Sequence, residues 1–261
     1  MTLDALITHG SGDEKITPTK VQIMGVGVTP FDGYWHAVDS IGRLIEGQRQ
    51  TFIAAINPEK LYRAQFDSEL KSLLNNANIT ICDGIGAAMA GRVLNGKMVP
   101  RITGVALFYE LIQAAEKRGW KIFLLGAAPD VNEQARLALS AANPALNIVG
   151  SLDGFFKNSD EAITAINKTG ADILFVAMGS PRQEVWIQQN RDKINASVLM
   201  GVGGTFDIVS GRIRRAPKIF RKTGTEWLYR LIREPKRFRR QLVLPKFMWL
   251  VVKHKLGFVK G

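Results

Sequence analysis

Short apolar runs alternate with amphipathic stretches along most of the chain, and this alternation limits the folds that the sequence can adopt. Runs typical of buried strands cover residues 21–28, 51–56, 79–82, 121–126, 147–150, 172–178 and 197–202. Between them, residues 107–118 and 131–142 carry apolar side chains at helical spacing. Because the strands are apolar on both faces, the order predicts an α/β fold: a Rossmann-like, mostly parallel sheet flanked by helices.

The residues that follow five of these strands are rich in Gly and in Asn, Asp or Gln. Ligands of parallel sheets bind at the carboxyl ends of the strands, and glycine lets backbone amides approach a phosphate closely. Each turn alone also fits a tight turn or a helix cap. Together they favour a nucleotide-sized cleft, with candidate residues Asn57, Asp83, Gly126, Gln183, Gly201, Gly203, Gly204 and Asp207.

Several nucleotide chemistries fit poorly. The segment 84–89 nearly matches G-x-G-x-x-G, but Met89 occupies the third small position and no acidic residue follows at the required distance, which argues against a nicotinamide enzyme. A P-loop motif is missing from the sequence. The three histidines are scattered and no acids are paired for a divalent metal, so we expect no metal or other cofactor. Arginines such as Arg101 would then neutralise a diphosphate.

The positive charge is concentrated at the end of the chain. Residues 211–261 contain 16 Lys and Arg against 2 acids, whereas residues 1–210 contain 19 against 21. Basic residues there alternate with large apolar ones, which is typical of a helix that adsorbs to anionic lipid. A charged helix pair that caps the core is the alternative, and nucleic-acid binding lacks a supporting motif. No apolar run reaches the roughly 20 residues of a membrane-spanning helix.

The composition suggests three segments. Residues 1–19 are expected to form a flexible leader, residues 20–210 the α/β domain, and residues 211–261 a basic, amphipathic helical appendage that associates with membranes. The single cysteine, Cys82, excludes an internal disulfide and fits a reducing cytoplasm, although a lone cysteine is often just a small buried side chain.

At the level of motifs the chain resembles the WecG/TagA/CpsF glycosyltransferases, over about residues 21–241. The motifs lie at residues 57–60, 83–86, 101–104, 179–184, 201–207, 215–218 and 226–231. The resemblance implies inverting, metal-independent transfer of a sugar from a UDP donor to a polyprenyl-diphosphate-linked sugar in bacterial surface polysaccharide biosynthesis. It also implies peripheral attachment to an anionic membrane surface, at the cytoplasmic face of the inner membrane. We allow for a homo-oligomer and expect no nucleic-acid partner.

The resemblance also assigns roles to residues. Asp83 matches the proposed general base, with a helix N-cap as its alternative role. Asn57 and Gln183, expected on neighbouring strand ends, match contacts to the donor sugar. Arg101 would hold a phosphate or the loop of the base, or form an ordinary surface ion pair. The glycines would admit the nucleotide and Asp207 would bind ribose or cap a helix; Arg215, Arg221 and Arg230 would meet diphosphates, and Arg233, Arg237, Arg240 and Trp249 would face lipid.

One position departs from the family pattern. Members that transfer N-acetylmannosamine carry Thr two positions before the Asn, where this chain has Ala55. Alanine is similar to the enterobacterial-common-antigen branch, which transfers N-acetylmannosaminuronic acid. A uronate donor would favour a nearby cation such as Arg182 or Arg101. Glucose and unmodified N-acetylmannosamine stay open as donor sugars, as does a non-catalytic binding module.

Overall fold

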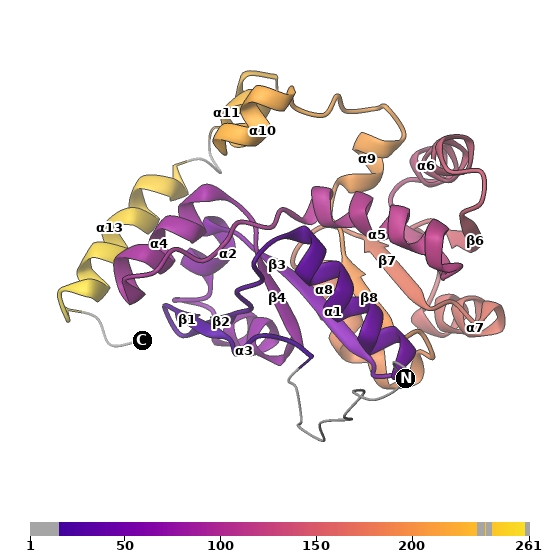
Figure 1. Cartoon of the computed structure of the whole chain (residues 1–261), viewed down its shortest axis with the longest axis horizontal. Helices are drawn as coiled ribbons and strands as arrows, with labels where there is room; N and C mark the ends of the chain where they lie inside the picture. Colours follow the sequence, from indigo (N-terminus) through magenta and orange to yellow (C-terminus); the bar gives the residue numbers. More distant parts are fainter. Residues whose placement is uncertain (1–15, 234–237, 239–241, 259–261) are drawn as a thin grey trace, which may run out of the picture.

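The computed structural model describes residues 16–233, 238 and 242–258, and its centre is a six-stranded sheet (Figure 1). The strand order is β4-β3-β8-β7-β5-β6, and every neighbouring pair is parallel. The strands are β3 (Thr51–Ile56), β4 (Ile79–Cys82), β5 (Lys121–Gly126), β6 (Asn147–Leu152), β7 (Ile173–Ala177) and β8 (Val198–Gly201). The predicted α/β fold is confirmed. Most of the predicted leader, residues 1–15, lies outside the described residues.

Residues 21–28 form a hairpin, so the prediction of one continuous strand there is wrong. Strands β1 (Val21–Ile23) and β2 (Val26–Val28) pair antiparallel as a separate sheet. The reason is a two-residue turn in which Met24 (φ 52°) and Gly25 (φ 75°) both have positive φ, as tight hairpin turns require. The hairpin lies against the edge strand β4, where Thr29 N donates to Thr80 O at 2.8 Å and Thr80 N donates to Thr29 Oγ1 at 3.1 Å.

Helices cover both faces of the large sheet because successive strand side chains point to opposite sides. On one face Phe52, Ala54 and Ile56 pack with α2 (Pro58–Arg63), α3 (Ser68–Asn76), α4 (Ile85–Asn95), α7 (Ser159–Thr169) and α8 (Arg182–Asn190). On the other face Ile53 packs with α1 (Tyr34–Glu46), α5 (Gly104–Arg118), α6 (Pro129–Ala142) and α9 (Thr205–Val209). A short 3₁₀ helix, η1 (Arg191–Lys193), follows α8.

All six strands run in the same direction, so the residues that follow β3, β4, β5 and β8 meet at one edge of the sheet. The expectation that Asn57 and Gln183 sit on neighbouring strand ends is wrong. Strand β8 lies between β3 and β7 because the last of the described strands returns to the middle of the sheet. Chain order alone does not determine this placement.

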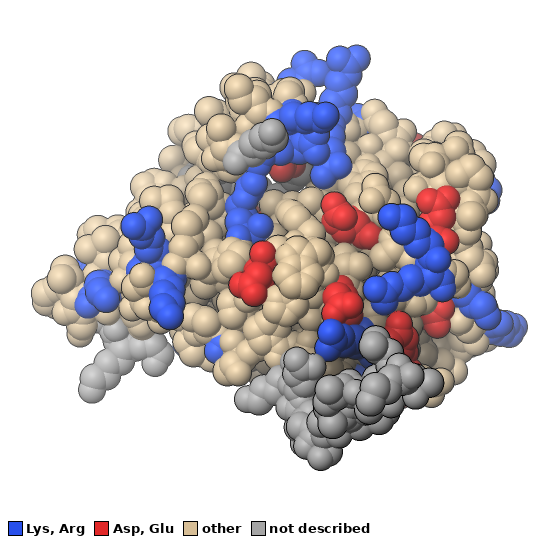
Figure 2. Space-filling view, viewed as in Figure 1, with Lys and Arg blue, Asp and Glu red and all other residues tan. Residues whose placement is uncertain are grey.

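The C-terminal segment contributes α10 (Lys218–Thr223), α11 (Glu226–Arg233) and α13 (Val243–Lys255). Helix α13 lies along α2 and α4 (Figure 1), and its residues Phe247 and Val251 are fully buried in the core of that face. Figure 2 shows Lys and Arg side chains gathered over α10 and α11 at the top of the view. No helix in the described ranges has both the length and the hydropathy needed to cross a membrane.

Candidate active site

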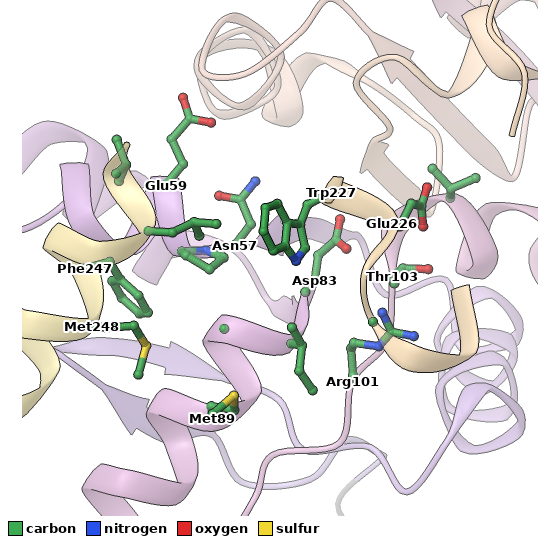
Figure 3. A pocket seen from close by; sticks show the side chains of 18 residues that line it. Asn57, Glu59, Asp83, Met89, Arg101, Thr103, Glu226, Trp227, Phe247 and Met248 are labelled. Atoms are coloured by element: carbon green, nitrogen blue, oxygen red, sulfur yellow. The ribbon is translucent and has the colours of Figure 1, made fainter. Parts of the chain in front are cut away.

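A pocket of about 440 Å³ opens at the carboxyl edge of the sheet, next to β3 and β4. The turns after these strands, the start of α5, the turn between α10 and α11, and α13 all contribute to its wall. Asn57, Asp83 and Arg101 line it together, and Figure 3 shows the Asp83 carboxylate directed into it. Three residues that the sequence analysis selected from separate motifs therefore share one cavity.

Asp83 follows β4 directly, and its N–H donates to Ile56 O at 2.7 Å, which extends the pairing of β3 with β4. Its Oδ2 lies 3.6 Å from the point that a Cβ on Gly104 would occupy, and the Cβ of Ala55 lies at the same distance from that point. The first turn of α5, which Thr103 caps, is thus beside the carboxylate and carries a partial positive charge. Gly84 is the N-cap residue of α4, and Asp83 directly precedes it.

Asn57 has a local structural role as well as its place in the pocket. It is the N-cap of α2, and its Oδ1 accepts a hydrogen bond from Lys60 N at 2.9 Å. This bond fixes the turn between β3 and α2 and orients the side chain that lines the pocket. The predicted contact of Asn57 with a donor sugar stays a prediction.

A buried ion pair that the sequence analysis missed joins α2 to α8. Lys60 Nζ lies 2.7 Å from Glu184 Oε1, and the two side chains are 9% and 0% exposed. Lys60 Nζ also donates to Ala55 O at 2.7 Å. The sequence held one signal for this pair. Lys60 and Glu184 are charged residues near the starts of helices that follow buried strands, and both belong to motifs already selected from the sequence.

Gln183 lies beside this ion pair and does not line the Asp83 pocket. It is 3% exposed, its Nε2 donates to Glu184 Oε1 at 3.0 Å, and its Oε1 accepts from Gly203 N at 2.9 Å. A Cβ on Gly201 would come within 2.5 Å of Gln183 Nε2, so the glycine leaves room for this amide. The geometry gives Gln183 a positioning role: it holds the loop between β8 and α9.

The remaining predicted nucleotide residues lie along the same edge of the sheet, outside the Asp83 pocket. Gly126 ends β5 with φ 109°, and a Cβ there would be 2.5 Å from Ala177 O of the neighbouring strand. Gly203 and Gly204 precede α9, and Asp207 lies in its first turn. Their contacts with a nucleotide stay predictions.

Arginines gather where the body meets the C-terminal segment. Arg101 donates to the backbone oxygen of Arg221, and the guanidinium of Arg215 lies over the ring of Tyr109, 4.6 Å from its centroid. Burial lowers the pKa of Arg215, and the charge of Arg221 lowers it further. The Nε atoms of Arg215 and Arg221 are buried and have no hydrogen-bond partner among the described residues. A bound anion would supply both the missing acceptor and the opposite charge.

The predicted lipid-facing residues are only partly described. Arg233 is exposed at the end of α11, and Trp249 on α13 is 60% exposed, with Lys253 Nζ 3.7 Å from a ring centroid. Arg230 belongs to α11, but its side chain is outside the description, and Arg237 and Arg240 lie outside the described residues. Within the described ranges no three His, Cys, Asp or Glu side chains gather around a possible metal site.

Comparison with known proteins finds a family model and curated relatives that match the chain. The family model described as the glycosyl transferase WecG/TagA/CpsF family matches residues 21–260. A curated protein of Bacillus spizizenii strain W23 is 33% identical over 216 residues, which cover 83% of this chain and 84% of the relative. That protein is named N-acetylglucosaminyldiphosphoundecaprenol N-acetyl-beta-D-mannosaminyltransferase.

Proposed function

Because the chain belongs to the WecG/TagA/CpsF family of glycosyltransferases, we propose that it transfers an N-acetylmannosamine-type sugar from a UDP donor to a polyprenyl-diphosphate-linked sugar. The family and the relative make it a hexosyltransferase. The observation that carries the proposal is the pocket in which Asp83 lies together with Asn57 and Arg101. The carboxylate can take the proton of an attacking hydroxyl, the amide can hydrogen-bond to a sugar, and the cation can stabilise a leaving diphosphate.

In the proposed reaction Asp83 acts as the general base. Its carboxylate takes the proton of the acceptor hydroxyl while that oxygen attacks the anomeric carbon of the donor from the side opposite UDP. The bond between the anomeric carbon and the phosphate oxygen breaks, and UDP leaves with the electron pair. The configuration at the anomeric carbon is therefore inverted. The β-linked product in the name of the Bacillus relative is consistent with an α-linked donor and inversion.

Arginines, in place of a metal ion, are proposed to neutralise the diphosphates. Arg215 and Arg221 are close enough for the charge of one to lower the pKa of the other, and their buried Nε atoms lack an acceptor in the described part of the chain. An anion would relieve both effects. The nucleotide would extend along the glycine-rich edge from Gly126 to Asp207, and Arg230 would add to the cation set.

The proposed location is the cytoplasmic face of the bacterial inner membrane, with the protein bound peripherally to anionic lipid. The support is the basic surface over α10 and α11 (Figure 2) together with the exposed apolar side chains of Ile232 on α11, 64% exposed, and Trp249 on α13. Each Lys or Arg near an anionic surface contributes on the order of 1 kcal/mol. Several of them would hold the protein there in a salt-sensitive way.

For the donor we propose N-acetylmannosaminuronic acid ahead of N-acetylmannosamine and glucose. Ala55 places a methyl group, without a hydroxyl, 3.6 Å from the point that a Cβ on Gly104 would occupy, and Asp83 Oδ2 lies at the same distance from that point. Arg101 lines the same pocket and could pair with a uronate carboxylate. A screen of these three UDP sugars, read out as UDP release, tests this order. The Ala55→Thr variant should shift preference toward N-acetylmannosamine, and an unchanged order of donors would refute the role of position 55.

Asp83→Asn tests the proposed mechanism. We expect turnover to fall about 100-fold or more because general-base catalysis typically contributes that much, while UDP affinity is retained. Asp192→Asn is the matched control, since the Asp192 side chain is 96% exposed. Turnover of Asp83→Asn equal to that of the control would remove Asp83 from the mechanism.

A further inference from the structure

The pocket that contains Asp83 has two ends of different polarity. Asp83, Asn57 and Arg101 form one end. Apolar side chains from α4 and α13 form the other, namely Met89, Leu244, Phe247 and Met248. Figure 3 shows Phe247, Met248 and Met89 on the side of the pocket away from Arg101. A ligand with a polar part near Asp83 and a hydrocarbon part near Met89 and Met248 would match this lining.

We propose that the apolar end binds the first isoprenoid units of the lipid-linked acceptor, so that the protein recognises the lipid as well as the sugar. This inference rests on the proposed function. The acceptor has a fixed covalent order: a sugar hydroxyl, a diphosphate and a branched hydrocarbon chain. With the hydroxyl at Asp83, the chain has to follow the wall that α4 and α13 provide.

The groups beside Asp83 at the polar end suit the diphosphate. Gly84, Ile85 and Gly86 line the pocket at the start of α4, an eleven-residue helix whose first N–H groups carry a partial positive charge. Arg101 also lines the pocket, from the segment that joins α4 to α5. A phosphate between them would have cationic partners while its hydrocarbon substituent points toward Met89.

The exposure of the apolar wall supports an apolar occupant. Met89 is 46% exposed although it lines a pocket, so a hydrocarbon chain could remove much of its side chain from water. On α13, Met248 lines the pocket beside the fully buried Phe247, whereas Trp249 and Val252 of the same helix are 60% and 48% exposed. The same helix thus offers apolar side chains both inside the pocket and on the outer surface.

The test compares two acceptors that share N-acetylglucosamine diphosphate and differ in the chain, a long polyprenyl group or a short alkyl group. The measured quantity is the ratio of kcat/KM for the long-chain acceptor to that for the short-chain acceptor. In Met89→Gln this ratio should fall about fivefold, because a polar amide replaces one apolar contact with the chain. Met89→Leu, which restores an apolar contact, should keep most of the wild-type ratio.

Met98→Gln is the matched control, since Met98 is also 46% exposed and does not line the pocket. It should keep the wild-type ratio, and equal urea midpoints for Met89→Gln and Met98→Gln would exclude a folding defect. Equal ratios in Met89→Gln and Met98→Gln, or a wild-type protein that uses both acceptors equally well, would overturn the inference alone. A wild-type protein that transfers sugar to neither acceptor would overturn the proposed function as well.

Discussion

Removing Lys60 should expose how much the fold depends on the ion pair between α2 and α8. The Lys60→Met change keeps the length of the side chain but leaves the Glu184 carboxylate, which is fully buried, without its cation. Loss of one partner of a buried ion pair typically costs about 3–5 kcal/mol. Lys60 Nζ also donates to Ala55 O, and this hydrogen bond would be lost as well, so we expect the upper part of that range.

Urea unfolding followed by circular dichroism measures this loss as a change in the free energy of unfolding. The double variant Lys60→Met/Glu184→Leu should recover a large part of it, because removing both charges also removes the unpaired buried carboxylate. Lys193→Met is the control, since Lys193 pairs with Asp160 at 3.8 Å on the surface, and it should stay within about 0.5 kcal/mol of wild type. A loss below about 1 kcal/mol in Lys60→Met would refute the reasoning. So would a double variant whose loss equals the sum of the losses of Lys60→Met and Glu184→Leu.

Three further outcomes are expected. Burial raises the pKa of the Cys82 thiol to about 12 from its ordinary value of 9.0, so the stability that the neutral thiol contributes is present below pH 9 and is lost as pH rises from 9 toward 12. The urea midpoint of wild type should therefore fall more steeply over that range than that of Cys82→Ala, and parallel curves would contradict this. Gly201→Ala places a methyl group 2.5 Å from Gln183 Nε2 and should lower the free energy of unfolding by about 1–3 kcal/mol. Gly204→Ala meets only ordinary contacts and should cost less; the reverse order would count against the role of Gln183. Phe247→Ala should cost about 3–5 kcal/mol in the same assay if α13 belongs to the core, whereas a near-zero cost would show that it does not.

The strands of the large sheet were predictable because they are buried on both faces and so appear as continuous apolar runs. The ranges 51–56, 79–82 and 121–126 agree with β3, β4 and β5. The hairpin at residues 21–28 was not predictable in the same way. Its apolar run continues through the turn, and Met24 is not a residue type that signals positive φ.

The site was predictable as a set of strand-end residues. The side chains and helices that contact these residues in the folded structure were not. Parallel strands bring Asn57 and Asp83 to one edge whatever the order of the sheet. The contact between Lys60 and Glu184 depends on which helices face each other across β8, and that is decided by packing of the whole face. The place of α13 against α2 and α4 depends on the same packing, because an amphipathic helix alone does not specify its partner.

The hairpin beside β4 has a consequence for association between copies of this protein. Unprotected sheet borders invite a foreign strand to add to them. Here the backbone N–H of Thr80 donates to Thr29, its C=O accepts from Thr29, and its hydroxyl donates to Gly27 O. These hydrogen-bonding groups at the edge of the sheet near Asp83 are therefore already paired within the chain. A neighbouring molecule would have to displace the hairpin from β4 before one of its strands could pair with the sheet on this side. The strand that presents the proposed base is thereby kept from joining an intermolecular sheet.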